Sequence, residues 1–212
     1  MAASTTAASS SPELNAVALV CTLKPSLHES SSDLMARRIL DRLAEHGVEG
    51  EVVRVVDYDV RPGISADEGE GDQWPAIREE ILASEILVIA TPTWVGHMSS
   101  VAHRVLERLD AELSDTDAAG RPAMTGKVAV AAVVGNEDGA HKLVADLFQS
   151  LDDIGFTIPA QGCTHWNDQA MGSTDYRDLP ADPDAVAETT ATLARNTAHL
   201  ARLLSEQNYP AP

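Results

Sequence analysis

Short apolar runs alternate with stretches of helical periodicity from residue 16 to the end of this chain. Residues 16–21, 51–56, 86–90, 128–134 and 156–158 form apolar runs that predict β-strands. Between them, apolar residues recur at spacings of three and four, which predicts amphipathic helices. We expect the first helix to end near residue 47. Further helices are expected over 74–83, 99–113 and 183–206, and another should include residues 143–154. This alternation predicts a parallel sheet with helices on both faces.

The composition of the strands predicts their order. The runs at 16–21, 86–90 and 128–134 are apolar throughout, as central strands of a parallel sheet are. The second strand carries Arg54, and the fifth runs into Pro159, which lacks a backbone N–H and suits an edge. We therefore expect a three-layer α/β/α sandwich around a five-stranded parallel sheet of order 2-1-3-4-5. Ligands of such sheets bind where the order reverses, here between the first and third strands.

One domain is expected over residues 14–206. Residues 1–13 are rich in Ala, Ser and Thr and are expected to form a disordered tail, and residues 207–212 a short second tail. No apolar run approaches the roughly 20 residues that span a bilayer, so no membrane segment is expected.

The most informative loop follows the third strand and precedes a helix. It reads Thr-Pro-Thr-Trp-Val-Gly-His-Met-Ser over residues 91–99. Trp94 offers a flat apolar face, and Gly96 lets the backbone approach a ligand closely. Together they predict a pocket for a planar ring system, with a flavin as the leading candidate.

The loop after the first strand, residues 22–33, is rich in hydroxyl groups and leads into a helix. Thr22, Ser30, Ser31 and Ser32, with Lys24 as a further cation, have the composition of a phosphate monoester site at a helix N-terminus. Neither a dinucleotide-binding glycine motif nor a nucleoside-triphosphate loop is present. The alternative is that one of the serines is only a helix cap.

Two further loops have two interpretations each. Gly135, Asn136, Asp138 and Gly139 follow the fourth strand and could let the backbone lie along a ligand, or could form an ordinary turn with Asp138 as cap. The long loop at 162–172 contains Trp166 and Met171. It could form a lid, part of a subunit interface, or a surface loop packed on its own aromatic residue.

Loops of this kind after the first, third and fourth strands resemble those of the flavodoxin-like NAD(P)H-dependent flavin and quinone reductases, over residues 16–163. The resemblance implies bound FMN, NADPH or NADH as electron donor, a small-molecule electron acceptor, and a homo-oligomer, often a dimer. It is most specific in the 91–99 segment and looser in the phosphate loop, where Lys24 stands in place of the usual Arg. The cofactor-binding residues expected on these grounds are Thr22, Lys24, Ser30, Ser31, Ser32, Pro92, Thr93, Trp94, Val95, Gly96, His97, Gly135, Asn136, Asp138 and Gly139.

Charge and residue spacing narrow the remaining functions. The formal net charge is −18, from 33 acidic and 15 basic residues, which disfavours nucleic acids and anionic membranes as partners. The charge fits either simple solubility or docking to a basic redox partner. Cys21 and Cys163 do not make a disulfide framework, so a reducing cytoplasm is expected. The histidines lack metal-site spacing, and no serine-hydrolase motif is present.

These features predict an FMN-binding oxidoreductase. A flavodoxin-type electron carrier without turnover of its own is the alternative, and a vestigial flavin site in a binding or assembly protein is a third possibility. We identify no catalytic acid or base, because a flavin carries the hydride chemistry itself. His97 and His141 are the titratable residues expected near the ring.

Overall fold

The computed structural model describes residues 13–168 and 170–212, and the greater part of the expected tail at 1–13 lies outside them. The helices and strands are β1 (Leu14–Val20), α1 (Ser31–Ala44), β2 (Val48–Arg54), α2 (Trp74–Ala83), β3 (Ile86–Trp94), β4 (His97–Met98), α3 (Ser100–Leu109), β5 (Val128–Val134), α4 (Ala140–Ile154), β6 (Cys163–Trp166) and α5 (Asp184–Glu206). Short 3-10 helices lie at Val55–Asp57, Asp110–Leu113 and Tyr176–Asp178.

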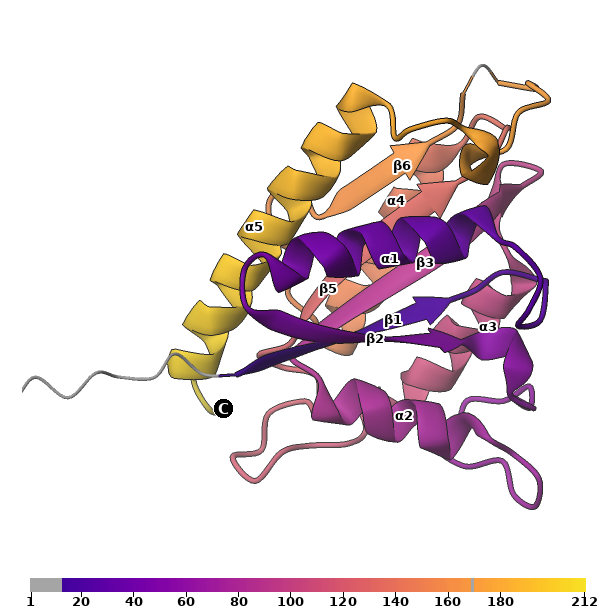
Figure 1. The fold of residues 1–212 in the computed structure, drawn as a ribbon. Coiled ribbons are helices and arrows are strands. Elements are labelled where there is room, and N and C mark those ends of the chain that lie inside the picture. The colour runs from indigo at the N-terminus through magenta and orange to yellow at the C-terminus, as the bar shows by residue number, and fades with distance from the viewer. Residues whose placement is uncertain (1–12, 169) are drawn as a thin grey trace, which may run out of the picture.

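The strands form one sheet in the order β2-β1-β3-β5-β6, and the pairs along this path are parallel. The order confirms the predicted 2-1-3-4-5 arrangement. The short strand β4 lies off this path and pairs antiparallel with the end of β3. The order reverses between β1 and β3, where Leu19 is in register with Ile89. The carboxyl ends of β1, β3 and β5 therefore meet at one edge (Figure 1).

Two layers of helices cover the sheet. Helices α1 and α5 lie on one face and are in contact with each other, and α2, α3 and α4 lie on the other (Figure 1). Alternate residues of the central strands enter opposite cores: in β3, Leu87 and Ile89 pack with α2, α3 and α4, and Val88 packs with α1 and α5. Burial on both faces explains why the central strands are apolar at every position.

The edge next to β5 differs from the sequence prediction. Thr157 makes an isolated bridge with Val128, and the paired strand is β6 at Cys163–Trp166, not 156–158. Residues 158–161 leave the ladder at Pro159, which cannot donate, and the chain rejoins it when Gly162 O accepts from Ala131 N at 3.0 Å. Cys163, expected in a loop, thus begins a strand.

Other boundaries also differ from the prediction. β2 begins and ends earlier than 51–56, so Arg54 is its last residue and not a central one. β3 extends into the expected loop as far as Trp94, because its last two residues pair with β4 in a tight hairpin. The helix predicted over 99–113 is α3 followed by a 3-10 turn.

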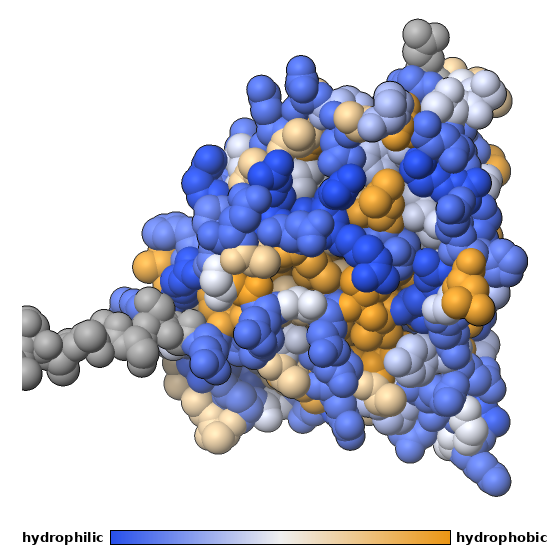
Figure 2. All heavy atoms as spheres, viewed as in Figure 1, coloured by the Kyte–Doolittle hydropathy of each residue, from blue (hydrophilic) through white to orange (hydrophobic). Residues whose placement is uncertain are grey.

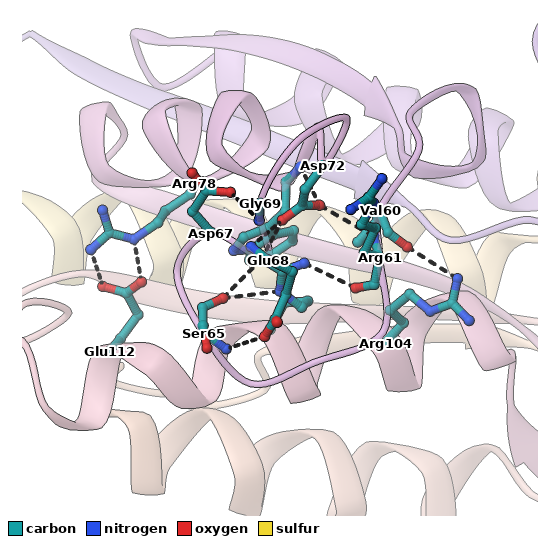
Figure 3. A network of polar contacts seen from close by, with 12 residues as sticks. Val60, Arg61, Ser65, Asp67, Glu68, Gly69, Asp72, Arg78, Arg104 and Glu112 are labelled. Atoms are coloured by element: carbon teal, nitrogen blue, oxygen red, sulfur yellow. Dashed lines mark hydrogen bonds and ion pairs between the residues drawn. The ribbon is translucent and has the colours of Figure 1, made fainter.

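The loop between β2 and α2 is fastened by a buried ion pair. Arg108 of α3 is fully buried, and its Nη2 lies 2.7 Å from Asp72 Oδ2. Arg108 also donates to the carbonyls of Arg61 and Ser65 and lies over the Trp74 ring. Figure 3 shows the surrounding contacts, including backbone donation from Glu68 to Asp72. The loop between β2 and α2 is therefore ordered by Arg108 of α3 together with carboxylates of the loop itself.

One face of the molecule is largely polar. Hydrophilic residues dominate the face shown in Figure 2, with apolar residues in smaller areas between them. Within residues 13–168 and 170–212, no helix has the length and apolar character needed to cross a membrane. Beyond α5, Tyr209 O accepts from Arg121 Nη1 at 2.9 Å, so this end of the chain contacts the domain.

Candidate functional site

A crevice of about 220 Å³ opens at the carboxyl edge of the sheet, where the order of strands reverses. Its walls come from the β1–α1 loop, the end of β3, the β5–α4 loop and the segment after β6. The lining residues are Thr22, Leu23, Lys24, Ser30, Ser31, Ser32, Pro92, Thr93, Trp94, Val134, Gly135, Asn136, Glu137, Trp166, Asp175 and Arg177.

The first turn of α1 forms one end of the crevice. Ser30 caps the helix, and its Oγ accepts from Asp33 N at 3.4 Å. Ser31 and Ser32 follow as the first helical residues and line the crevice. The helix N-terminus brings unpaired backbone N–H groups and the positive end of the helix dipole to this wall. The capping interpretation therefore holds for Ser30, and phosphate binding by Ser31 and Ser32 stays a prediction.

Arg54 fixes the shape of this loop. Its Nη1 donates to the carbonyls of Pro25 (2.9 Å) and His28 (2.8 Å), and its Nη2 lies 3.1 Å from Asp33 Oδ1. Asp57 holds the same loop by accepting from Ser26 N at 2.7 Å. The end of β2 therefore orders the β1–α1 loop without lining the crevice.

The β3–β4 hairpin forms the other end. Trp94 lines the crevice with its side chain 51% exposed. Val95 follows at φ 52°, a rare conformation for a β-branched residue, and Gly96 follows at φ 69°. The strained turn lets the chain reverse within two residues, so that Trp94 pairs with His97 and stays at the mouth.

The hairpin is tied to the β5–α4 loop. Gly96 N donates to Glu137 Oε2 at 3.3 Å, and a Cβ at Gly139 would lie 3.1 Å from Gly96 Cα. Val95, Gly96, His97, Asp138 and Gly139 are absent from the crevice lining, and their assignment as cofactor residues stays a prediction. The two glycines allow the close contact between the loops.

The segment after β6 closes one side of the crevice. Met171 N donates to Asn136 O at 2.6 Å, and Asn136 Nδ2 lies 3.4 Å from Asp175 Oδ1. Trp166 packs on Tyr176 with ring centroids 5.6 Å apart. The segment therefore packs on an aromatic residue of its own and contacts the crevice, and a role as a lid or in a subunit interface stays a prediction.

Ten of the fifteen predicted cofactor residues line the crevice together: Thr22, Lys24, Ser30, Ser31, Ser32, Pro92, Thr93, Trp94, Gly135 and Asn136. The crevice is also lined by residues that were not among the predicted cofactor residues: Leu23, Val134, Glu137, Trp166, Asp175 and Arg177. The first three adjoin selected residues. Trp166 could have been found as an aromatic residue in a long loop, whereas nothing in the local sequence around Asp175 and Arg177 indicates a place in the site.

The pKa values of Cys21 and His165 limit the chemistry that these residues can perform near the crevice. Burial raises the pKa of the Cys21 thiol far above its usual range, so it is not a thiolate nucleophile at neutral pH. Burial, together with His141, lowers the pKa of His165, and the two rings lie 5.4 Å apart. In the described part of the chain, no group of three or more His, Cys, Asp or Glu could hold a metal ion.

The crevice has the donors that FMN would require. Thr93 is 3% exposed, lines the crevice and has an Oγ1 without a hydrogen-bond partner. A buried hydroxyl of this kind requires a partner, and an ordered water or a polar atom of a ligand can supply it. The helix N-terminus and cations stand at the phosphate end, and an aromatic face stands at the mouth, so the residues present fit a flavin mononucleotide.

Comparison with known proteins agrees with this fit. Residues 14–170 match the family described as NADPH-dependent FMN reductase. The 8-demethyl-8-aminoriboflavin-5'-phosphate synthase of Streptomyces davaonensis is 31% identical over 206 residues, covering 92% of this chain and 80% of that protein. The divalent metal cation transporter MntH of Mycobacterium bovis is 33% identical over 198 residues, covering 90% of this chain. The chain spans only 29% of that transporter's length.

Solved structures show the same relationship. The crystal structure of RosB with the bound intermediate 8-demethyl-8-formylriboflavin-5'-phosphate matches with a TM-score of 0.84 at 29% identity, covering 92% of this chain and 82% of that one. An apo NADH:FMN oxidoreductase matches with a TM-score of 0.60 at 17% identity, covering 89% and 88%, which speaks for the fold alone. With its flavodoxin-like sheet and the match over residues 14–170, the chain belongs to the NADPH-dependent FMN reductase family.

Proposed function

We propose that this chain binds FMN in the crevice and passes electrons from NADPH or NADH to a small-molecule acceptor. The observation that carries the proposal is the pairing of a hydroxyl-rich helix N-terminus with Trp94 across one crevice, with the buried Thr93 hydroxyl between them in need of a partner. When bound, FMN supplies the hydride and electron-transfer chemistry.

Residues of the crevice have binding roles on this proposal, and Arg54, which lies outside the crevice, has a positioning role. Ser31 and Ser32 hold the phosphate through the α1 N-terminus, with Lys24 as a nearby cation. Trp94 borders the ring, and Thr93 Oγ1 bonds a polar atom of the ligand. Arg54 positions the phosphate loop through its bonds to backbone carbonyls. None of these groups needs to transfer a proton for the cofactor to act.

Anaerobic mixing of the FMN-loaded protein with NADPH or NADH tests the proposed reaction. Rapid bleaching of the flavin absorption by either nucleotide, followed by return of the colour when a quinone is added, is the expected result. If neither nucleotide bleaches the flavin while dithionite does, the chain is an electron carrier and not a reductase.

A second function is favoured by the 31% identity to the aminoriboflavin phosphate synthase and by the match to RosB. On this proposal, FMN is the substrate, and its ring methyl group is oxidised by an added oxidant such as dioxygen and then replaced with nitrogen from an amine donor. Mass spectrometry of flavin recovered after aerobic incubation with an amine donor separates the two proposals. Recovery of FMN with unchanged mass under these conditions contradicts the second.

We also propose that the chain acts as a dimer in the cytoplasm. Large apolar side chains stand exposed around the crevice mouth, among them Leu23, Trp94, Val95 and Met171. A second copy would cover this rim. Light scattering during gel filtration tests the proposal, and the mass of a single chain at micromolar concentration would contradict it.

A further inference from the structure

Arg177 belongs to the last part of the chain, yet its positively charged side chain lies beside the β1–α1 loop. It lies in the 3-10 helix Tyr176–Asp178, beyond residue 170, where the family match ends. Its backbone N–H lies 3.4 Å from Ser31 Oγ, and its Nη1 donates to Glu29 O at 2.9 Å. These contacts hold the guanidinium beside the first turn of α1, where Arg177 lines the crevice.

The guanidinium of Arg177 is incompletely satisfied. Its Nη2 lies 3.3 Å from Asp175 Oδ2. Its Nε is buried and has no hydrogen-bond partner, and Asp178 Oδ1 lies 3.6 Å away. Because this Nε is enclosed, an oxyanion in the crevice would meet the terminal nitrogens instead. Nη1 and Nη2 each carry two N–H groups, of which Glu29 O and Asp175 engage one each, so donors remain for an oxyanion. An Arg fork is well suited to phosphate because two N–H groups can meet two oxygens.

The charge of the chain favours a cation at this place. A formal charge of −18 disfavours the approach of a phosphate dianion, and cations close to the site offset this effect. Glu137 and Asp175 also line the crevice and add negative charge. Lys24 and Arg177 are the cations in its lining, and the Lys24 side chain is exposed, whereas that of Arg177 is 27% exposed. The less solvated cation makes the stronger contribution.

We propose that Arg177 binds the phosphate of the flavin and thereby makes the crevice select FMN over riboflavin. The inference rests on the proposed function, since it assumes a flavin in the crevice. Arg177 would be a phosphate-binding residue outside the β1–α1 loop, to which the sequence pattern assigns the phosphate. The segment after β6 would thereby take part in ligand recognition.

A purely structural role is the competing explanation. Arg177 contacts Glu29 O and Asp175, so it could serve only to dock residues 170–182. Arg38 provides a matched control, because its Nε lies 3.0 Å from Asp182 Oδ2 and anchors the same segment without lining the crevice. Arg38→Gln changes the charge equally and loosens the same segment.

The experiment measures the affinities of FMN and riboflavin, by flavin fluorescence quenching, for the wild-type protein, Arg177→Gln, Arg177→Lys and Arg38→Gln. Arg177→Gln should weaken FMN roughly 10- to 100-fold, as loss of a hydrogen bond to a charged group does. Riboflavin should change less than about threefold, and Arg38→Gln should leave both flavins within the same margin. Arg177→Lys, which keeps the charge, should give a smaller loss confined to FMN, and it serves if Arg177→Gln does not fold.

Other results separate the failure of this inference from that of the proposed function. Equal losses of FMN and riboflavin in Arg177→Gln, or the same loss in Arg38→Gln, would overturn the role of Arg177 while leaving flavin binding intact. A wild-type protein that binds neither flavin overturns the proposed function. In that case inorganic phosphate is the probe: stabilisation of the wild type but not of Arg177→Gln against heat supports Arg177 as a phosphate ligand, and equal or absent stabilisation contradicts it.

Discussion

Thr93 and Trp94 are neighbours at the end of β3, but their surroundings differ. Thr93 is almost completely buried with an unpaired hydroxyl, and Trp94 is half exposed at the mouth. A half-exposed indole contributes little to a core, so truncation of Trp94 should mainly remove contact with a ligand. The two neighbours are therefore expected to contribute differently to ligand binding, Thr93 through a hydrogen bond and Trp94 through apolar contact.

Trp94→Ala should lower the affinity for FMN and for riboflavin by a similar factor, roughly one to two orders of magnitude, because both ligands carry the ring. The melting temperature should hardly change. Titration of both flavins, together with a thermal melt, measures this. A lower melting temperature with unchanged affinities would mean that Trp94 is a structural residue.

Ser31→Ala tests the opposite end of the crevice. Loss of a hydrogen bond to a charged group costs about 1.5–3 kcal/mol, so FMN should bind more weakly and riboflavin almost as before. The same pair of titrations gives the answer. Equal weakening of both flavins would show that Ser31 does not face the phosphate.

At the scale of elements, the loop between β2 and α2 depends on one ion pair. Arg108→Ala leaves Asp72 buried and unpaired, which should cost about 3–5 kcal/mol of unfolding free energy. Arg42→Ala removes an exposed pair with Glu45 and should cost less than about 1 kcal/mol. Urea unfolding of both variants measures the difference. Similar small costs would contradict a structural role for the buried pair.

The same ion pair predicts a pH dependence. Burial alone would raise the pKa of Asp72, but hydrogen bonds from Arg108 and from the backbone of Glu68, Arg61 and Trp74 lower it well below its usual range. A carboxyl with a lowered folded-state pKa adds stability above its unfolded pKa of about 3.9, and this stability is lost as the pH falls further.

Unfolding free energies at pH 5 and pH 3 test this dependence. The wild-type protein should lose more stability between these values than Asp72→Asn, because the variant has no carboxyl to protonate. The other acids are common to both proteins and cancel in the comparison. An equal loss of stability in the two proteins would show that protonation of Asp72 is not responsible for it.

The elements that the sequence predicts best are those fixed by local pattern. Residues 128–134 and 74–83 have the predicted bounds, because an unbroken apolar run or a regular helical spacing specifies each. β6 was misplaced, since an edge strand of four residues that alternates in burial has little pattern of its own. Arg177 and Asp175 were missed because only the path of the chain after β6 brings them to the crevice.

For the whole molecule, topology determines where the ligand lies. The sheet order was predictable from which strands are apolar throughout, and the crevice follows from the point where that order reverses. The composition of the crevice was partly predictable, since loops after β1, β3 and β5 must meet at one edge. The electrostatic potential inside the crevice could not be predicted from the sequence, because two cationic and two carboxylate side chains line the same small space.

The most direct test of the account is a crystal structure of the protein grown with FMN. We predict electron density for FMN in the crevice, with its phosphate at the first turn of α1 near Ser31 and Arg177 and its ring against Trp94. The Thr93 hydroxyl should then have a hydrogen-bond partner on the ligand. FMN bound elsewhere on the molecule, or bound with its phosphate away from α1, would contradict the account.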